Sequence, residues 1–264
     1  MVGARNPGPA AIAVALAATL LGCTAPPSAA EAVGQAPGRT LDAHKARMRW
    51  RVGSGLAQYQ ALGAYDFGTN RGTARVGLEG KAPPAKPEPK SPDDRATGSP
   101  GDVVLAGGTA YQRLGLLLTG GYLGGAPWLS YSTGAPEAPL FDPRTVIHLV
   151  AALSAVRKVG QADVAGGRYS GQLEIARALA ITHEDPKEIE RIPKALRSRN
   201  LTVDVWLDRA GRIAQVRTAP PRGARSLVLD LSLELYDFGV DVPVTLPPPE
   251  EVADADTLTP ERSG

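Results

Sequence analysis

Residues 226–238 read SLVLDLSLELYDF, and leucine occupies every second position from 227 to 235. Side chains of a β-strand point alternately to its two faces, so this period of two predicts a long strand with one buried face. Leu201–Asp208, LTVDVWLD, alternates in the same way. It runs into Asp208-Arg-Ala-Gly211, which is typical of a hairpin turn because glycine adopts positive φ freely. A return strand is predicted over Arg212–Thr218.

The same alternation recurs through the rest of the chain, which holds 30 glycines and 24 prolines. The further strands that we predict are Gln58–Gly68, Thr73–Gly80, Asp102–Leu105, Thr109–Leu114, Trp128–Ser132, Val156–Asp163 and Arg168–Ala176. About nine to eleven strands joined mostly by short turns indicate an antiparallel meander.

Two or three helices are expected beside this sheet. Asp142-Pro143 combines an N-cap with proline at the first helical position, and RTVIHLVAALSAV after it is apolar on nearly every side, which predicts a buried helix. Asp185-Pro186 begins a second helix with the same signal. Leu41–Met48 is the third and shortest prediction. The sequence therefore predicts the α+β class.

The N-terminus has the organisation of an export signal. Residues 10–21 are apolar, and Leu20-Leu21-Gly22-Cys23 follows directly. This resembles the bacterial lipobox, in which the cysteine receives a diacylglycerol anchor and the chain is cut before it. We expect residues 1–22 to be removed as a signal peptide and residues 23–38 to be a lipidated Cys23 with a flexible tether. The alternative is an ordinary secretory signal with a chance cysteine.

The folded domain is predicted to span residues 39–250. Three segments within it or after it are expected to lie outside its regular structure. Residues 81–101 carry six prolines and are expected to be a disordered insertion. Residues 115–126 are rich in glycine and apolar side chains. They are a lid over an apolar opening, with Leu117 and Tyr122 as its candidate residues, a surface that touches lipid, or one more buried strand. Residues 251–264 are expected to be a polar disordered tail.

The composition argues against several classes of protein. A single cysteine excludes an intramolecular disulfide framework and cannot form a thiolate metal site alone. A net charge of +2 argues against nucleic-acid binding. His44, His148 and His183 have no metal-ligand spacing, and no nucleophile motif is present. We therefore predict no enzyme activity, no catalytic residues, no metal and no cofactor.

Several motifs together resemble the LppX/LprG-type envelope lipoproteins, whose fold is related to that of the LolA/LolB carriers. The motifs are the lipobox Cys23, the aromatic strand Pro127–Tyr131, the helix Asp142–Ala155, the strands Val156–Gly160 and Gly166–Leu173, the hairpin Leu201–Arg212, and the ending Tyr236–Gly239 with Asp241–Val244. The resemblance covers about residues 39–250. The segments 81–101 and 115–126 are longer than the family's pattern.

The resemblance implies a strongly curved antiparallel half-barrel with helices packed on its concave side and an apolar cavity between them. Our candidate cavity residues are Leu201, Val203, Val205, Leu207, Leu227, Leu229, Leu231, Leu233, Leu235, Tyr169, Leu173, Ile175, Val146, Ile147 and Val150. The same apolar stripes would also suit a filled core, and the sequence leaves both readings open.

The expected function is lipid binding and transport by an exported lipoprotein. It would be anchored through Cys23 to the outer face of the bacterial cell membrane, in an actinobacterial cell envelope. Its partners would be a lipid or glycolipid ligand, the membrane, and an envelope transport or signalling protein. The alternative is a non-carrier domain of the same fold that senses envelope state or binds a protein.

Overall fold

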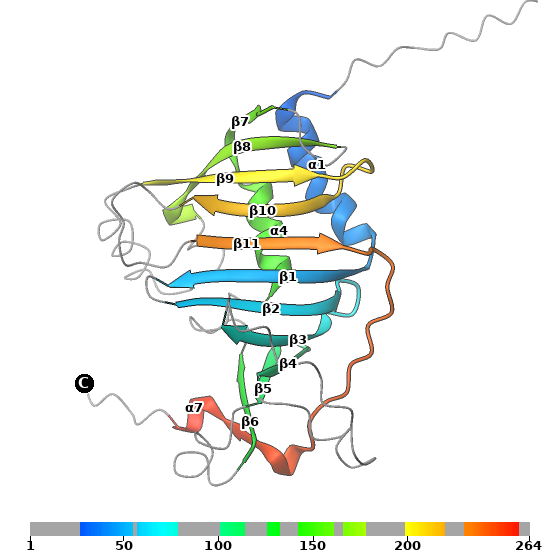
Figure 1. Ribbon diagram of the computed structural model, residues 1–264, viewed down its shortest axis with the longest axis vertical. Coiled ribbons are helices and arrows are strands. Elements are labelled where there is room, and N and C mark those ends of the chain that lie inside the picture. Colours follow the sequence, from blue (N-terminus) through cyan, green and yellow to red (C-terminus); the bar gives the residue numbers. More distant parts are fainter. Residues whose placement is uncertain are drawn as a thin grey trace, which may run out of the picture.

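The computed structural model describes residues 27–54, 57–78, 101–113, 126–132, 142–160, 166–177, 199–219 and 230–258. Within these ranges twelve strands form one sheet that does not close, in the order β12-β6-β5-β4-β3-β2-β1-β11-β10-β9-β8-β7. Neighbouring strands are antiparallel except β12 and β6, which are parallel. Helices α1 and α4 run behind the sheet (Figure 1).

The bounds of the elements are as follows. The helices are α1 Ala29–Asp42, α4 Pro143–Ala151, the 3-10 helix η1 Pro249–Glu251 and α7 Ala255–Leu258. The strands are β1 Lys45–Ser54, β2 Ala57–Asp66, β3 Arg71–Leu78, β4 Asp102–Ala106, β5 Thr109–Arg113, β6 Trp128–Ser132, β7 Ser154–Lys158, β8 Gly167–Glu174, β9 Asn200–Leu207, β10 Ile213–Ala219, β11 Asp230–Tyr236 and β12 Val252–Asp254.

One face of the sheet, which we call the core face, forms the hydrophobic core with α1 and α4. The register carries this face from strand to strand: Trp50 on β1 lies opposite Leu233 on β11 and Ala61 on β2. Since adjacent residues point to opposite faces, a polar neighbour of each of these residues lies on the outer face. Val33 of α1 and Ile147 of α4 belong to the same buried cluster as the core-face side chains.

Ion pairs join neighbouring strands on the outer face of the sheet. Arg49 Nη1 lies 2.9 Å from Glu234 Oε2, and Arg75 Nε lies 3.0 Å from Asp102 Oδ1. All four side chains are partly exposed, so each pair adds little stability. Cross-strand charge pairs of this kind favour the correct register over alternatives.

A buried threonine fastens α1 to the sheet. Thr40 Oγ1 donates a hydrogen bond to the Ala36 carbonyl at 2.7 Å and accepts one from the Ile213 N–H at 2.8 Å. The β10–β9 pairing is irregular between Ile213 and Gln215, where a β-bulge interrupts the ladder. The hydroxyl of Thr40 therefore satisfies a backbone donor at the bulge.

The predicted α+β class, with one mostly antiparallel sheet and few helices, is confirmed. Trp128–Ser132 agrees at both ends, and the other predicted strands in the described ranges agree to within a few residues. The helix after Asp142 is confirmed as α4, although it ends at Ala151 and strand β7 already begins at Ser154. For the strand predicted over Ser226–Phe238, the described part is β11, Asp230–Tyr236.

The flexible tether predicted over residues 23–38 is wrong from Ala29 onward, because α1 begins there. A capping box starts the helix: Ser28 Oγ accepts from the Glu31 N–H, and the Glu31 carboxylate accepts from the Ser28 N–H. Val33 and Ala36 are buried in the core. The short helix predicted over Leu41–Met48 is also wrong, because α1 ends at Asp42 and β1 begins at Lys45.

The disordered tail predicted over 251–264 is wrong as far as residue 258. Val252–Asp254 forms β12, which pairs in parallel with β6, and Ala255–Leu258 forms α7. Backbone pairing with an otherwise open strand edge gives this polar segment its structure. The helix predicted after Asp185, most of the insertion 81–101 and nearly all of the loop 115–126 lie outside the described residues.

Candidate functional site

Most of the candidate cavity residues lie together, on or against the core face. Those inside the buried cluster are Val146, Ile147, Val150, Tyr169, Leu173, Ile175, Leu201, Val203, Val205, Leu207, Leu233 and Leu235, and Leu231 packs against its edge. Cys23, Leu117, Tyr122, Leu227 and Leu229 lie outside the described residues. The sequence pattern therefore identified one connected apolar surface, spread over several strands and α4.

Helix α4 is positioned over this surface by its N-terminus. Asp142 Oδ1 accepts hydrogen bonds from the Arg144 N–H at 2.9 Å and from the Tyr65 hydroxyl at 3.3 Å. The same hydroxyl also contacts Asn70 Oδ1, in the turn between β2 and β3, so the two acceptors share its single proton. Burial, and then the Asp142 carboxylate, raise the pKa of Tyr65 above its usual range.

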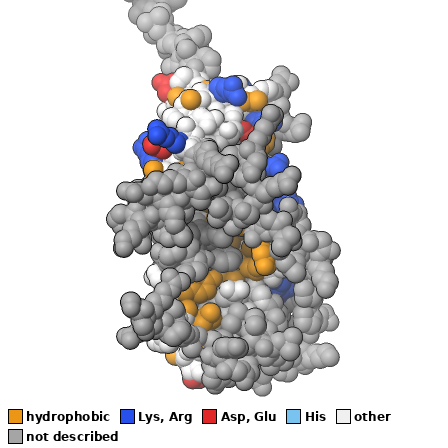
Figure 2. Space-filling view, turned by 90° about the vertical axis from the view of Figure 1, so that its left-hand side faces the viewer, with side chains coloured by type: hydrophobic (Ala, Val, Ile, Leu, Met, Phe, Trp, Pro, Cys, Tyr) orange, Lys and Arg blue, Asp and Glu red, His pale blue; other side chains and the backbone are white. Residues whose placement is uncertain are grey.

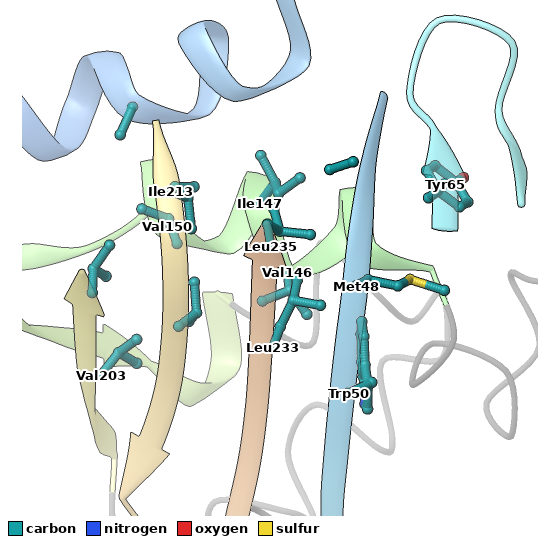
Figure 3. Packing of buried hydrophobic residues seen from close by; sticks show 14 of the residues in the cluster. Met48, Trp50, Tyr65, Val146, Ile147, Val150, Val203, Ile213, Leu233 and Leu235 are labelled. Atoms are coloured by element: carbon teal, nitrogen blue, oxygen red, sulfur yellow. The ribbon is translucent and has the colours of Figure 1, made fainter. Parts of the chain in front are cut away.

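The side chains between α4 and strands β10 and β11 fill the space there. Figure 3 shows Val146 and Ile147 facing the leucines of β11, with Val150 near Ile213. Ile147 and Leu233 are fully buried. These candidate cavity residues therefore form packed core in this part of the sheet.

The core face is more open where β1 ends and β2 begins. The register places Val52 of β1 opposite both Tyr59 of β2 and Leu231 of β11. Val76 of β3 lies opposite Ala61, two residues after Tyr59 on β2. Tyr59 is 46% exposed although it points to the core face, and Val76 and Leu231 are half-buried. Figure 2 shows the molecule hollowed on this side, with hydrophobic side chains inside. We call the region of Val52, Tyr59, Val76 and Leu231 the apolar hollow.

Trp50, Val52 and Tyr59 were not among the residues predicted for the site. For β1 the sequence does carry a strand pattern, because Ala46, Met48, Trp50 and Val52 alternate with basic residues. Trp50 is buried and its Nε1 has no hydrogen-bond partner.

The free energy of unfolding should depend on pH through a second tyrosine, Tyr131. Burial raises the pKa of the Tyr131 hydroxyl on β6 to about 12, against the ordinary value of 10.0. The folded state therefore holds this proton more tightly than the unfolded chain. The stabilisation is complete below pH 10 and is lost as the pH rises from 10 to about 12.

We expect Tyr131→Phe to reduce the loss of stability over this interval. The measurement is urea unfolding at several pH values from about 9 upward, for the variant and the parent. Tyr236→Phe, at an exposed position of β11, is the matched control and should follow the parent. Equal alkaline profiles for all three proteins would contradict the assignment.

Neither a metal-ligand cluster nor a membrane-spanning helix occurs among the described residues. No cluster of histidine, cysteine, aspartate and glutamate in these ranges could hold a metal ion. Among the described helices, none combines the length and the apolar character needed to cross a membrane.

The comparisons with known proteins leave the family open. No protein-family model matches the sequence, and a search of curated proteins found no significant match. Among thirteen similar chains of solved structures is an uncharacterized conserved protein from Thermus thermophilus. It shares 8% sequence identity at a TM-score of 0.39, over 82% of this chain and 95% of that chain. A likeness this distant carries no argument about function.

Proposed function

We propose that the protein is an exported lipoprotein that binds and carries lipids or lipidated molecules in the apolar hollow. The observation that carries this proposal is the hollow itself: it is apolar and lies at the open end of the core face, where Tyr59 is exposed. Burial of acyl chains there would contribute about 0.8 kcal/mol for each methylene group removed from water.

The remaining parts of the proposal come from the sequence and the topology. The sheet would curve as a half-barrel with α1 and α4 on its concave side, as in the envelope lipoproteins that the sequence resembles. Cys23 would carry the anchor and hold the domain at the outer face of the cell membrane. The two acyl chains of a diacylglycerol are enough for stable anchoring. A transport or signalling protein of the envelope would be the partner.

Native mass spectrometry tests the binding directly. Residues 24–264, produced without the cysteine and purified gently from a bacterial host, should carry a population heavier by one phospholipid or glycolipid. Organic extraction should remove this mass. A chain that stays bare after incubation with mixed envelope lipids would refute lipid carriage, and would instead favour a sensing or protein-binding domain of the same fold.

A large side chain placed in the hollow should greatly reduce lipid binding without unfolding the protein. Val76→Trp places a large side chain on the core face of β3, where Val76 is half-buried. We expect the lipid-bound population to fall at least tenfold and the fold to persist at a cost of about 1–3 kcal/mol. Thr73→Trp, on the outer face of the same strand, is the control and should keep its lipid. Equal lipid loading of both variants would place the ligand elsewhere.

A further inference from the structure

Trp50 carries a buried hydrogen-bond donor that has no acceptor. Its side chain is 3% exposed, and its indole Nε1 has no hydrogen-bond partner. Buried polar groups in folded proteins are nearly always paired, since an unpaired group forfeits its bonds to water without replacement. Each exception calls for a physical explanation.

Among the described residues, the sheet neighbours of Trp50 on its own face offer no polar side chain. Its register partners are Leu233 on β11 and Ala61 on β2, and the residues two positions away on β1 are Met48 and Val52. All four are apolar. The basic residues next to Trp50 in the sequence point to the opposite face of the sheet, and arginine has no acceptor to offer in any case.

The position of Trp50 suggests what the acceptor is. Figure 3 shows Trp50 beyond Met48 along β1. Val52, at the apolar hollow, is the next core-face residue of the same strand. A lipid in the hollow would bring hydrocarbon to the aliphatic side chains. At the head of each ester-linked acyl chain it would also bring a carbonyl oxygen, which accepts a hydrogen bond readily.

We infer that the indole N–H of Trp50 donates a hydrogen bond to the ester carbonyl of a bound acyl lipid. This inference rests on the proposed lipid binding and adds the chemical class of the ligand. The bond would fix how deeply the acyl chain enters, because the carbonyl has one position along the chain. It would also favour ester-linked lipids over ether-linked ones, which lack that oxygen.

A matched pair of ligands tests the inference. Lysophosphatidylcholine with one palmitoyl ester and its hexadecyl ether analogue differ by a single carbonyl group. Their affinities for residues 24–264 are measured by calorimetry below the concentrations at which they form micelles. We expect the parent protein to bind the ester about fivefold more tightly, which corresponds to one net hydrogen bond. Trp50→Phe should bind both ligands equally.

Trp128 provides the matched control within the same chain. It is also buried, its Nε1 also has no partner, and it lies on the outer face of β6, where it pairs with Val252 of β12. Trp128→Phe removes the same group from the other side of the sheet. The fivefold preference for the ester should therefore persist in this variant.

A measurement without mutation covers the case in which Trp50→Phe does not fold. In protein labelled with nitrogen-15 at the tryptophan indoles, the Trp50 indole proton should move downfield with the ester ligand and much less with the ether. An unchanged resonance, or a preference for the ester that survives Trp50→Phe, would overturn the inference while leaving lipid binding intact. Failure of both ligands to bind the parent would overturn the proposed function as well.

Discussion

Leu233→Ala is expected to lower the free energy of unfolding by about 3 kcal/mol, because it leaves a cavity at the centre of the core. Leu233 is 0% exposed and lies between Trp50 of β1 and Val216 of β10, under α4. A truncated leucine loses its transfer free energy and the contacts of its neighbours together. Urea unfolding should show a lower midpoint with an unchanged slope.

Leu246→Ala is the natural control for this measurement. Leu246 is 46% exposed, in the extended segment that follows β11, so its loss should change the stability by less than about 0.5 kcal/mol. Similar costs for the two alanine variants would show that the core is not packed around Leu233 as described. The proposed hollow would then have to extend along β11 as far as Leu233.

Thr40→Val should cost about 2 kcal/mol although it keeps the size and branching of the side chain. The change removes the hydroxyl that accepts from the Ile213 N–H, so a buried backbone donor at the β-bulge loses its partner. The valine methyl groups cannot replace this bond. Hydrogen exchange should show the loss as faster exchange of the Ile213 amide in the variant.

Thr40→Ser separates the hydroxyl from the methyl group. Serine retains both hydrogen bonds, to the Ala36 carbonyl and from Ile213, and should keep the slow exchange at Ile213. Its cost in stability should be smaller than that of valine. A larger cost for serine would mean that packing of the methyl group, rather than the hydrogen bond, holds α1 to the sheet.

The strands were predictable because their periodicity is a direct consequence of burial on one face. Leu201, Val203, Val205 and Leu207 alternate with polar residues, and all four are buried in the structure. Turn residues such as Gly211, whose φ is +74°, marked the hairpins. Register and strand order could not be obtained in this way, since both depend on contacts between distant segments.

Strand β1 was missed because its first residues were predicted as a short helix, and α7 lies in the predicted tail. Helix α1 and strand β12 escaped prediction because tertiary contacts outweigh their local preferences. Helix α1 contains glycine and Pro37 and has few large apolar residues, so its composition resembles a linker. It is stable because Val33, Ala36 and Thr40 are buried against the sheet. Strand β12 has only three residues and depends on pairing with β6.

The candidate site was predictable in part. The apolar stripes of β8, β9 and β11 were identified correctly as one surface, yet most of them form packed core. The residues at the hollow come mainly from β1, β2 and β3. The alternation of apolar and basic residues in β1 is a strand signal, but part of this segment was predicted as the helix Leu41–Met48. The orphan donor of Trp50 is a property of its surroundings, which no sequence pattern reports.

The order of strands in the sheet has a consequence for how the chain is made. Strand β1 lies between β2 and β11, and its contact Arg49–Glu234 joins residues 185 positions apart. Helix α1 packs on β7, β9 and β10, all of which leave the ribosome long after it. A nascent chain that stops before β7 therefore lacks the strands on which its first helix packs, and a chain that stops before β11 still lacks the partner for one edge of β1. The sheet can be completed only when synthesis is nearly finished, and such non-local pairing is slow to form. Strands β1–β6 and β7–β10 are each neighbours in sequence order and can pair earlier, so the pairing of β1 with β11, which joins these two halves of the sheet, is the step that waits for the end of the chain.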